Sequence, residues 1–389
     1  MAGLTGRGQR TTGAPKPSIR RVAIVMFAGA SLVAGLMGAL TLLGVPSTPA
    51  GPQLAGFHGA LMTIGFLGTV IALERAVALN RPWGFAAPMA SGFAGVLMMA
   101  GGPWALVTLL IAFAALVYLA IYVELVRLDR TLHTAVQATG AVGWVLAAGL
   151  LVTGRPVADA VPAIVAFLIL TVAGERLELA RLSRLTTGAR RTFLAAAGLF
   201  AAGVIVALPN PDAGLRLGGV GLVAMALWLA RHDIARRTVR IKGVTRFIAL
   251  CLLAGYAWLA VGGAAWIAWG ASAPALGRDA ELHALFLGFV ISMVFGHAPV
   301  ILPAVLRVPL PYRPSFYAHL ALLHAGLVLR VLVGDALGQT WAWHAGGVLT
   351  VSAMLLFVIV SATTVVGATR AMHAEDQRRT MRADRAGRA

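Results

Sequence analysis

The stretch AELHALFLGFVISMVFGHAPVILPAVLR, residues 280–307, decides the fold class of this chain. It can cross a bilayer as a helix, because about 20 predominantly apolar residues span the hydrocarbon core. His283 and His297 lie within it, within about 40° of one helical face and roughly 21 Å apart along the axis. Because ionisable groups inside a membrane span are functional candidates, the stretch predicts a membrane helix with a histidine site near each end.

The composition of the whole chain points to the same class of protein. Of the 389 residues, 59% are hydrophobic and 12% are charged, about half the charged share of a soluble domain. The mean hydropathy is +0.85. The single cysteine, Cys251, excludes a disulfide framework and a multi-cysteine metal site. We therefore expect an all-α, polytopic membrane protein whose main partner is the lipid bilayer.

A window of about 20 residues finds about twelve candidate spans. They cover roughly residues 20–45, 55–79, 83–102, 104–127, 132–153, 157–182, 190–208, 214–231, 246–270, 280–306, 314–336 and 340–368. The flanking segments are polar and basic. We expect a disordered cytosolic leader over residues 1–19, a twelve-helix transmembrane domain over residues 20–368 and a charged cytosolic tail over residues 369–389.

The basic residues predict the orientation of the chain. With twelve spans, all but four of the 32 Lys and Arg residues fall on one side; the four exceptions are Arg155, Arg216, Arg278 and Arg330. The positive-inside rule then places both termini in the cytosol. This topology explains the net charge of +18, so we expect no nucleic-acid partner. The abundance of Ala, Gly and Arg suggests a GC-rich bacterial genome, and hence a bacterial cytoplasmic membrane.

The chain carries a weak internal repeat. Glu74 and Arg75 in the second span recur as Glu175 and Arg176 in the sixth, and histidines open the second and tenth spans. This spacing suggests three four-helix units. Glutamates in apolar runs need a partner, so the two acidic–basic pairs predict structural ion pairs with neighbouring helices or, alternatively, a proton entrance.

His58 and His283 form the sharper candidate site. They open two parallel spans at a similar depth near the outer side, so together they can ligate one metal or the iron of one haem. Small residues follow both histidines, as a haem between helices requires. The alternative is that both histidines sit at headgroup depth and the small residues serve ordinary helix packing.

A second group lies nearer the cytosolic side. It consists of His297, His319 and His324. These side chains predict a second metal site, with copper the candidate, or a proton path. His319 and His324 point about 140° apart round their helix, so both can face one site only if it is broad. Interhelical hydrogen bonding is the alternative to shared ligation by His297 and His324.

These features resemble two families. Twelve spans in groups of four, with histidines opening spans two and ten, look like the catalytic subunit of haem-copper oxidases. The segments GHAPVILPAVLR and HLALLHAGLVLR look more like the NnrS family, haem- and copper-containing membrane proteins linked to nitric oxide stress. The resemblance implies that His58 and His283 are axial haem ligands and that copper lies near His297 and His324. Spans six and seven lack the histidines of the oxygen-reducing centre, so oxygen reduction is not expected.

Three functions remain open from the sequence. The first is an NnrS-like protein that holds haem non-covalently, since no CxxCH attachment motif occurs. The second is a proton-coupled secondary transporter or permease that uses the intramembrane Glu and His residues. The third is a metal-handling or assembly protein without turnover. The sequence names neither a redox partner nor a small-molecule substrate.

Overall fold

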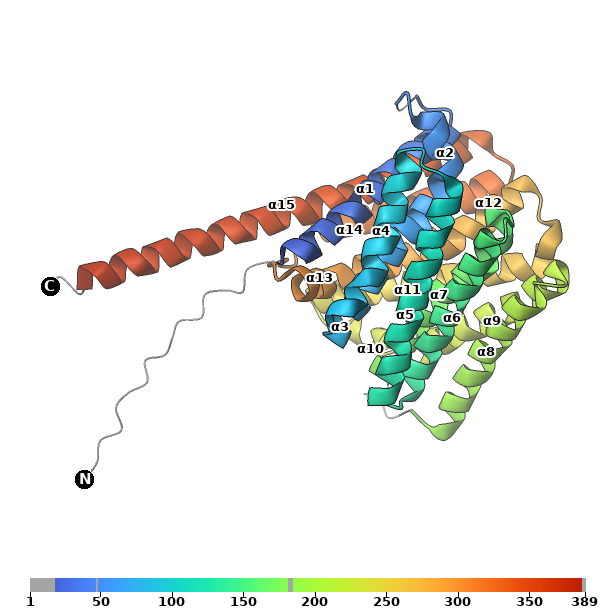
Figure 1. Ribbon diagram of the computed structural model, residues 1–389, viewed down its shortest axis with the longest axis horizontal. Helices are drawn as coiled ribbons and strands as arrows, with labels where there is room; N and C mark the ends of the chain where they lie inside the picture. Colours follow the sequence, from blue (N-terminus) through green and yellow to red (C-terminus); the bar gives the residue numbers. More distant parts are fainter. Residues whose placement is uncertain (1–17, 47, 181–184, 387–389) are drawn as a thin grey trace.

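The computed structural model describes residues 18–46, 48–180 and 185–386. Within these ranges the chain forms helices and no strand, and Figure 1 shows the helices gathered in one bundle. The elements in chain order are α1 (Ile19–Leu42), α2 (Gly51–Ala60), η1 (Leu61–Gly68), α3 (Thr69–Leu79), η2 (Pro82–Phe85), α4 (Ala86–Met99), α5 (Trp104–Leu128), α6 (Leu132–Val152), α7 (Val157–Ala180), α8 (Thr187–Val206), α9 (Pro211–His232), α10 (Ala235–Thr238), α11 (Val244–Trp269), η4 (Gly270–Ser272), α12 (Ala275–His283), η5 (Ala284–Ile291), α13 (Ser292–Leu306), α14 (Phe316–Leu327), η6 (Val328–Asp335) and α15 (Thr340–Ala386).

Eleven helices in the described ranges are long and apolar enough to cross a membrane, which confirms the all-α, multi-pass membrane fold. The predicted span at residues 83–102 is the exception. Its helix, α4, has 14 residues, about 21 Å of rise against a hydrocarbon core of about 30 Å. The 3₁₀ turn η2 shortens it at one end, and Gly101, with φ +68°, ends it at the other. It still packs against α1 and α5.

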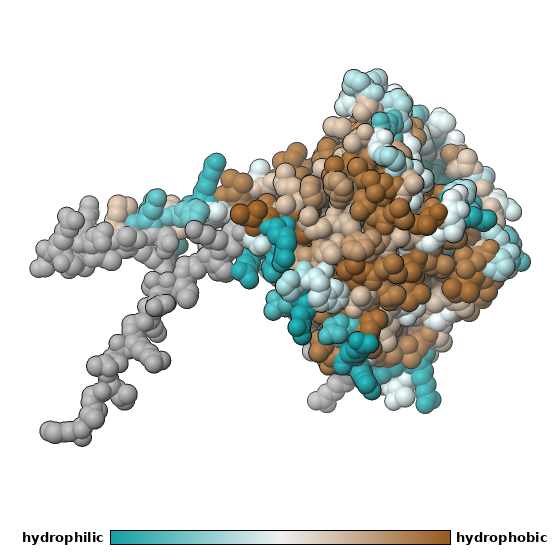
Figure 2. Space-filling model, in the orientation of Figure 1, coloured by the Kyte–Doolittle hydropathy of each residue, from teal (hydrophilic) through white to brown (hydrophobic). Residues whose placement is uncertain are grey.

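The surface separates a hydrophobic middle from two polar ends. Figure 2 shows hydrophobic residues gathered over the middle of the helices and hydrophilic residues gathered at the loops. We call the end that carries the starts of α2, α7 and α12 the histidine end, because His58 and His283 lie there. The opposite end, which carries the basic loops after α3, α5 and α9, is the arginine end.

Three of the spanning helices contain an eight-residue π-helical segment, which lies inside spans two and ten and forms the last part of span eleven. η1 follows His58, η5 follows His283, and η6 contains Arg330 and Asp335. π-helical turns are rare and are frequent at functional sites. Spans two and ten therefore share both a histidine and a helical irregularity, whereas α7, the sixth span, is α-helical throughout.

Helix α15 continues beyond the membrane-spanning part of the chain. It has 47 residues, about 70 Å of rise, and Figure 1 shows its C-terminal part projecting from the bundle. The predicted boundary between residues 368 and 369 thus falls inside a continuous helix. Most of the predicted leader, residues 1–17, lies outside the described residues.

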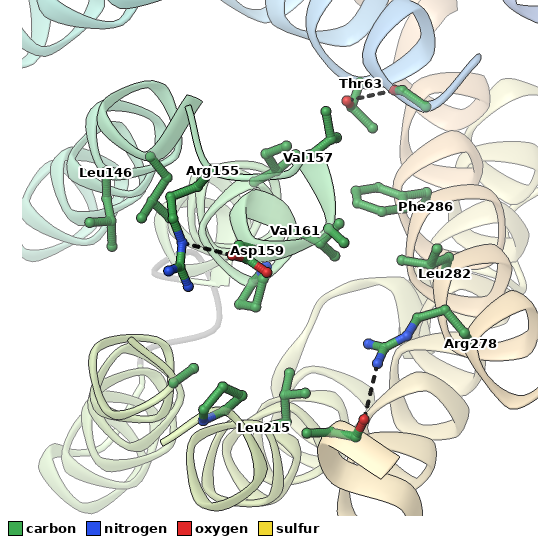
Figure 3. A pocket seen from close by; sticks show the side chains of 18 of the residues that line it. Thr63, Leu146, Arg155, Val157, Asp159, Val161, Leu215, Arg278, Leu282 and Phe286 are labelled. Atoms are coloured by element: carbon green, nitrogen blue, oxygen red, sulfur yellow. Dashed lines mark hydrogen bonds and ion pairs between the residues drawn. The ribbon is translucent and has the colours of Figure 1, made fainter. Parts of the chain in front are cut away.

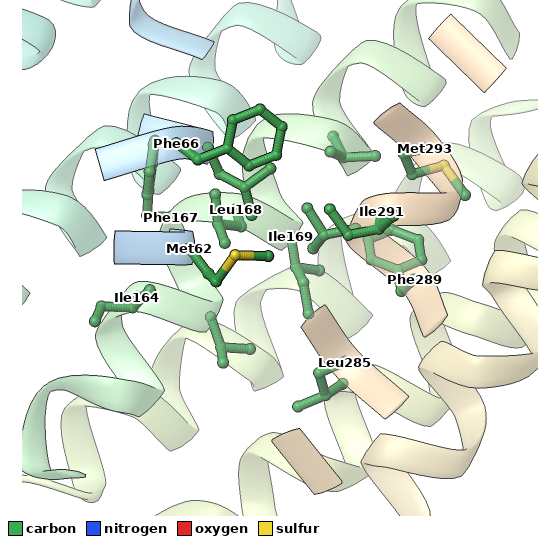
Figure 4. Close-up of a cluster of buried hydrophobic side chains, with 14 of the residues drawn as sticks. Met62, Phe66, Ile164, Phe167, Leu168, Ile169, Leu285, Phe289, Ile291 and Met293 are labelled. Carbon is green, nitrogen blue, oxygen red and sulfur yellow. The ribbon is translucent and has the colours of Figure 1, made fainter. Parts of the chain in front are cut away.

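A central apolar cluster joins span two, α7 and span ten (Figure 4). Its buried members are Phe66 of η1, Phe167, Leu168 and Ile169 of α7, and Phe289 and Ile291 of η5. Trp144 of α6 stacks on Phe167 with ring centroids 4.5 Å apart. Burying each phenylalanine contributes roughly 1.5–3 kcal/mol relative to exposure in water. The cluster fixes the three helices that carry the candidate site.

Candidate functional site

A cavity of about 890 Å³ opens at the histidine end. Its walls come from α2 and η1, the facing ends of α6 and α7, the start of α9, and α12 with η5 (Figure 3). Most of the lining is apolar, as at Leu146, Val161, Leu215 and Phe286. This volume lies within the roughly 300–1,000 Å³ of small-molecule and cofactor sites.

His58 lines this cavity from the end of α2. Its Nδ1 donates to the carbonyl oxygen of Gly35 on α1, at 2.7 Å. The helices approach closely here, since a Cβ added at Gly35 would lie 2.8 Å from the Met62 sulfur. The bond fixes the tautomer of the imidazole, so Nε2 keeps its lone pair.

His283 lines the same cavity from the end of α12. Its Nδ1 donates to the carbonyl oxygen of Asp279 at 2.8 Å and lies 3.3 Å from the Asp279 carboxylate. Two residues hold that carboxylate: Arg330 donates twice, at 2.8 and 2.9 Å, and Trp343 Nε1 donates at 3.2 Å. This is the arrangement in which an outer acceptor orients a ligating histidine.

The structure therefore brings the two predicted outer histidines to one site. Both side chains line the same cavity, His58 from the end of α2 and His283 from the end of α12. In the described part of the chain, neither Nε2 has a hydrogen-bond partner. Two imidazole lone pairs thus remain free for a ligand.

The three remaining candidate histidines have separate surroundings. His297 donates from Nδ1 to the Met293 carbonyl at 2.6 Å and accepts from Arg176 at Nε2 at 2.8 Å, so both of its nitrogens are engaged. His324 accepts from Trp258 Nε1 at 3.0 Å. The bonds from Arg176 to His297 and from Trp258 to His324 join different helices, as in the alternative of interhelical hydrogen bonding, whereas the bond to Met293 lies within α13.

His319 is almost fully buried among aromatic rings. Phe295, Phe357 and Phe247 meet it edge-on, with centroids 4.6, 5.4 and 6.0 Å away, and neither of its nitrogens has a partner within the described ranges. Those ranges contain no group of three or more His, Cys, Asp or Glu side chains placed to hold a metal ion. Shared copper ligation by His297, His319 and His324 stays a prediction; in the structure His297 bonds to Arg176 of α7, His324 bonds to Trp258 of α11, and His319 packs against phenylalanines.

The acidic–basic pairs meet between α3 and α7. Arg75 Nη2 donates to Glu74 at 2.6 Å and to Glu175 on the neighbouring helix at 2.8 Å. Arg176 turns instead to His297. These side chains are at least three-quarters buried, and they form an ionised layer toward the arginine end.

Three layers repeat along the three central helices. From the histidine end, each helix carries a cavity residue, then a residue of the central apolar cluster, then a polar residue that belongs to the ionised layer or, in the case of His297, accepts a hydrogen bond from it. The order is His58, Phe66 and Arg75 along span two; Ile164, Phe167 and Glu175 along α7; and His283, Phe289 and His297 along span ten. The cavity and the ionised layer are therefore separated by packed apolar side chains.

Several residues of the site were not predicted from the sequence. Asp279 was missed, although its position four residues before His283 places both on one helical face. Arg155 and Arg278 line the cavity with Asp159. The sequence marked the two arginines only as exceptions to the positive-inside distribution of basic residues. The walls from α6 and α9 carried no signal in the sequence.

Comparison with models of protein families finds a match over most of the chain. The model of a domain of unknown function, DUF8744, matches residues 21–366, which include all eleven helices long enough to span a membrane, apart from the first residues of α1 and the end of α15. A search of curated proteins finds no match. The chain belongs to the DUF8744 family.

Proposed function

We propose that this protein is a multi-pass membrane protein that binds haem non-covalently in the cavity, with His58 and His283 as the axial ligands. The observation that carries the proposal is that both imidazoles line one cavity with Nδ1 bound to a backbone carbonyl and Nε2 free. Histidine is a common axial ligand of haem iron. These two residues would hold the haem iron.

The residues present fit a haem in three respects. The donor atoms are neutral imidazole nitrogens held by outer hydrogen bonds. The lining is mostly apolar, and the cavity volume of about 890 Å³ is that of a cofactor site. Arginines stand at the rim, where the acidic edge of a haem would need cations.

With both histidines on the iron, haem bound there would supply one-electron chemistry. The protein's own contribution is to orient both imidazoles and to keep water out of the bundle below the cavity with the central apolar cluster. The role in nitric oxide stress, the bacterial cytoplasmic membrane and the cytosolic placement of both termini belong to this proposal. Copper does not, because both nitrogens of His297 are engaged.

The test is reconstitution with haemin in detergent or nanodiscs. The wild-type protein should give a shifted Soret band at one haem per chain, and the double variant His58→Ala, His283→Ala should lose it. The variant His344→Ala is the matched control, because this histidine also lies at the histidine end, is exposed, and does not line the cavity. A wild-type protein with no Soret shift contradicts the proposal.

A proton-coupled transporter is the second candidate. The observation that favours it is the ionised layer around Arg75, which lies nearer the arginine end than the cavity, whereas the cavity opens at the histidine end. Buried ionisable residues mark proton relays in membrane proteins. This function requires the central apolar cluster to open. Proton uptake by proteoliposomes that is lost in Glu74→Gln but kept in His58→Ala would favour it over haem binding.

A further inference from the structure

Two arginines stand on opposite sides of the cavity. Arg155 precedes α7 and Arg278 lies in α12, and both line the cavity (Figure 3). They are two of the four basic residues at the histidine end, the end that the charge asymmetry otherwise keeps free of cations. Two cations at one cavity therefore need a local explanation.

Each guanidinium is held by one acidic partner and keeps donors for a ligand. Arg155 donates from Nε to Asp159 at 2.8 Å, and its two terminal nitrogens have no hydrogen-bond partner within the described residues. Arg278 donates from Nη1 to Glu281 at 2.7 Å, with a long contact of 3.4 Å from Nη2 to the Ala271 carbonyl. A guanidinium has five N–H donors, so most remain available.

The charge that faces the cavity is positive. Arg155, Arg278 and Asp159 are its charged lining residues, and the rest of the lining is apolar or neutral. Glu281, the partner of Arg278, has a fully buried side chain and is not part of the lining. An anionic group at the rim would thus meet two oriented guanidinium groups, the side chain best suited to paired hydrogen bonds with carboxylates.

We propose that Arg155 and Arg278 form a carboxylate-binding rim, so that the cavity takes ligands with an apolar body and one or two carboxylate groups. This inference rests on the proposed function if the ligand is haem, whose porphyrin ring is then the apolar body. A free amphipathic acid has the same chemistry, and the experiment distinguishes the two sources.

The test compares ligands that differ only in their carboxylates. Metal-free protoporphyrin IX and its dimethyl ester are titrated by fluorescence into protein in zwitterionic nanodiscs; dodecanoic acid and dodecanol form a second, linear pair. The wild type should prefer the free acid of at least one pair. Arg155→Gln, Arg278→Gln should weaken binding of that acid about tenfold per arginine, the size of one charged hydrogen bond, and leave the uncharged partner unchanged.

The matched control is Arg216→Gln. Arg216 is also an arginine of the histidine end, paired with Asp212 at 2.9 Å across one helical turn as Arg155 is with Asp159, but it does not line the cavity. It should keep the preference for the acid. A preference for the porphyrin acid points to haem, and one for dodecanoic acid alone points to a free amphipathic acid.

Two outcomes overturn the inference: no preference for either acid in the wild type, or a preference that survives in the double variant. Failure of the haem proposal gives a different pattern. Metal-free porphyrin binding does not involve the imidazole lone pairs, so it should survive in His58→Ala, His283→Ala. If the wild type binds metal-free porphyrin but gives no Soret shift with haemin, the carboxylate-binding rim is supported and the assignment of His58 and His283 as haem ligands is contradicted.

Discussion

Asp279 and Arg330 lie 51 positions apart and form a two-point ion pair, with Arg330 Nε 2.8 Å and Nη2 2.9 Å from the two carboxylate oxygens. The pair joins α12 to the π-helical segment η6. The Arg330 guanidinium also lies over the ring of Trp343, 4.5 Å from its centroid. Because the Asp279 carbonyl accepts from His283, the pair fixes the helical turn that aims this histidine into the cavity.

Arg330→Gln should therefore destabilise the protein and loosen the site. Removing one partner leaves the Asp279 carboxylate without its cation, a loss of about 3 kcal/mol for a buried pair. Loss of an outer hydrogen bond weakens metal binding by about 10–100-fold, so haemin affinity should fall in that range. Thermal unfolding and Soret titration measure the two effects.

The exposed pair Arg216–Asp212 provides the comparison. Both side chains are more than 40% exposed, and exposed pairs contribute about 0–1 kcal/mol. Arg216 also donates to the carbonyl oxygens of Ile267 and Ala268 at the end of α11. Arg216→Gln should therefore lower the melting temperature less than Arg330→Gln does and leave haemin affinity close to that of the wild type. Equal effects of the two substitutions would contradict a special role for the Asp279–Arg330 pair.

Gly38→Ala should separate α1 from α2. A Cβ at Gly38 would lie 2.7 Å from the carbonyl carbon of Leu54, and backbone cannot move aside as a flexible side chain can. Overpacking of this kind costs typically 1–3 kcal/mol, and the shift should weaken the bond from His58 to Gly35. Lower thermal stability together with weaker haemin binding is the expected result.

Gly29→Ala is the control on the same helix, because a Cβ at Gly29 meets nothing within 4 Å. Alanine has the higher helix propensity, so this variant should melt at or slightly above the wild-type temperature. If Gly38→Ala behaves in the same way, the close approach of α1 and α2 does not position His58.

Arg75→Gln should lower the stability of the protein more than neutralising Glu74, Arg75 and Glu175 together. The single change leaves Glu74 and Glu175 as two buried carboxylates without a cation, which costs about 3–5 kcal/mol. The triple variant Glu74→Gln, Arg75→Gln, Glu175→Gln removes all three charges together and should be milder. Thermal unfolding of the two variants tests this order, and a triple variant that is the less stable of the two would contradict it.

Phe167→Ala should open the central apolar cluster. The ring is 1% exposed and stacks on Trp144, so its removal leaves a cavity at a cost of about 3–5 kcal/mol. If the cluster separates the cavity from the ionised layer, the variant should also leak protons in proteoliposomes. Phe167→Leu, which fills more of the space, should leak less; unchanged leakage in both would show that the cluster is not the barrier.

The sequence predicted those parts of the site that depend on one helix at a time. Hydropathy identified the spans, and the missing oxidase histidines in spans six and seven removed oxygen reduction from consideration. Depth along each span grouped His58 with His283, because 1.5 Å of rise per residue fixes depth once a span is placed. It did not resolve α4, whose apolar stretch is long enough but whose helix is shortened by its Pro and Gly ends.

What the sequence alone determined is the class of the protein: a chain of apolar helices with a few ionisable groups at two depths. The tertiary structure decided which of those groups meet. It joined Asp279 to Arg330, turned Arg176 toward His297, enclosed His319 among phenylalanines and packed α7 against η5 of span ten. The physical reason is that helical periodicity is local, whereas membrane helices choose their neighbours through small residues and interhelical hydrogen bonds, since lipid is as apolar as their side chains.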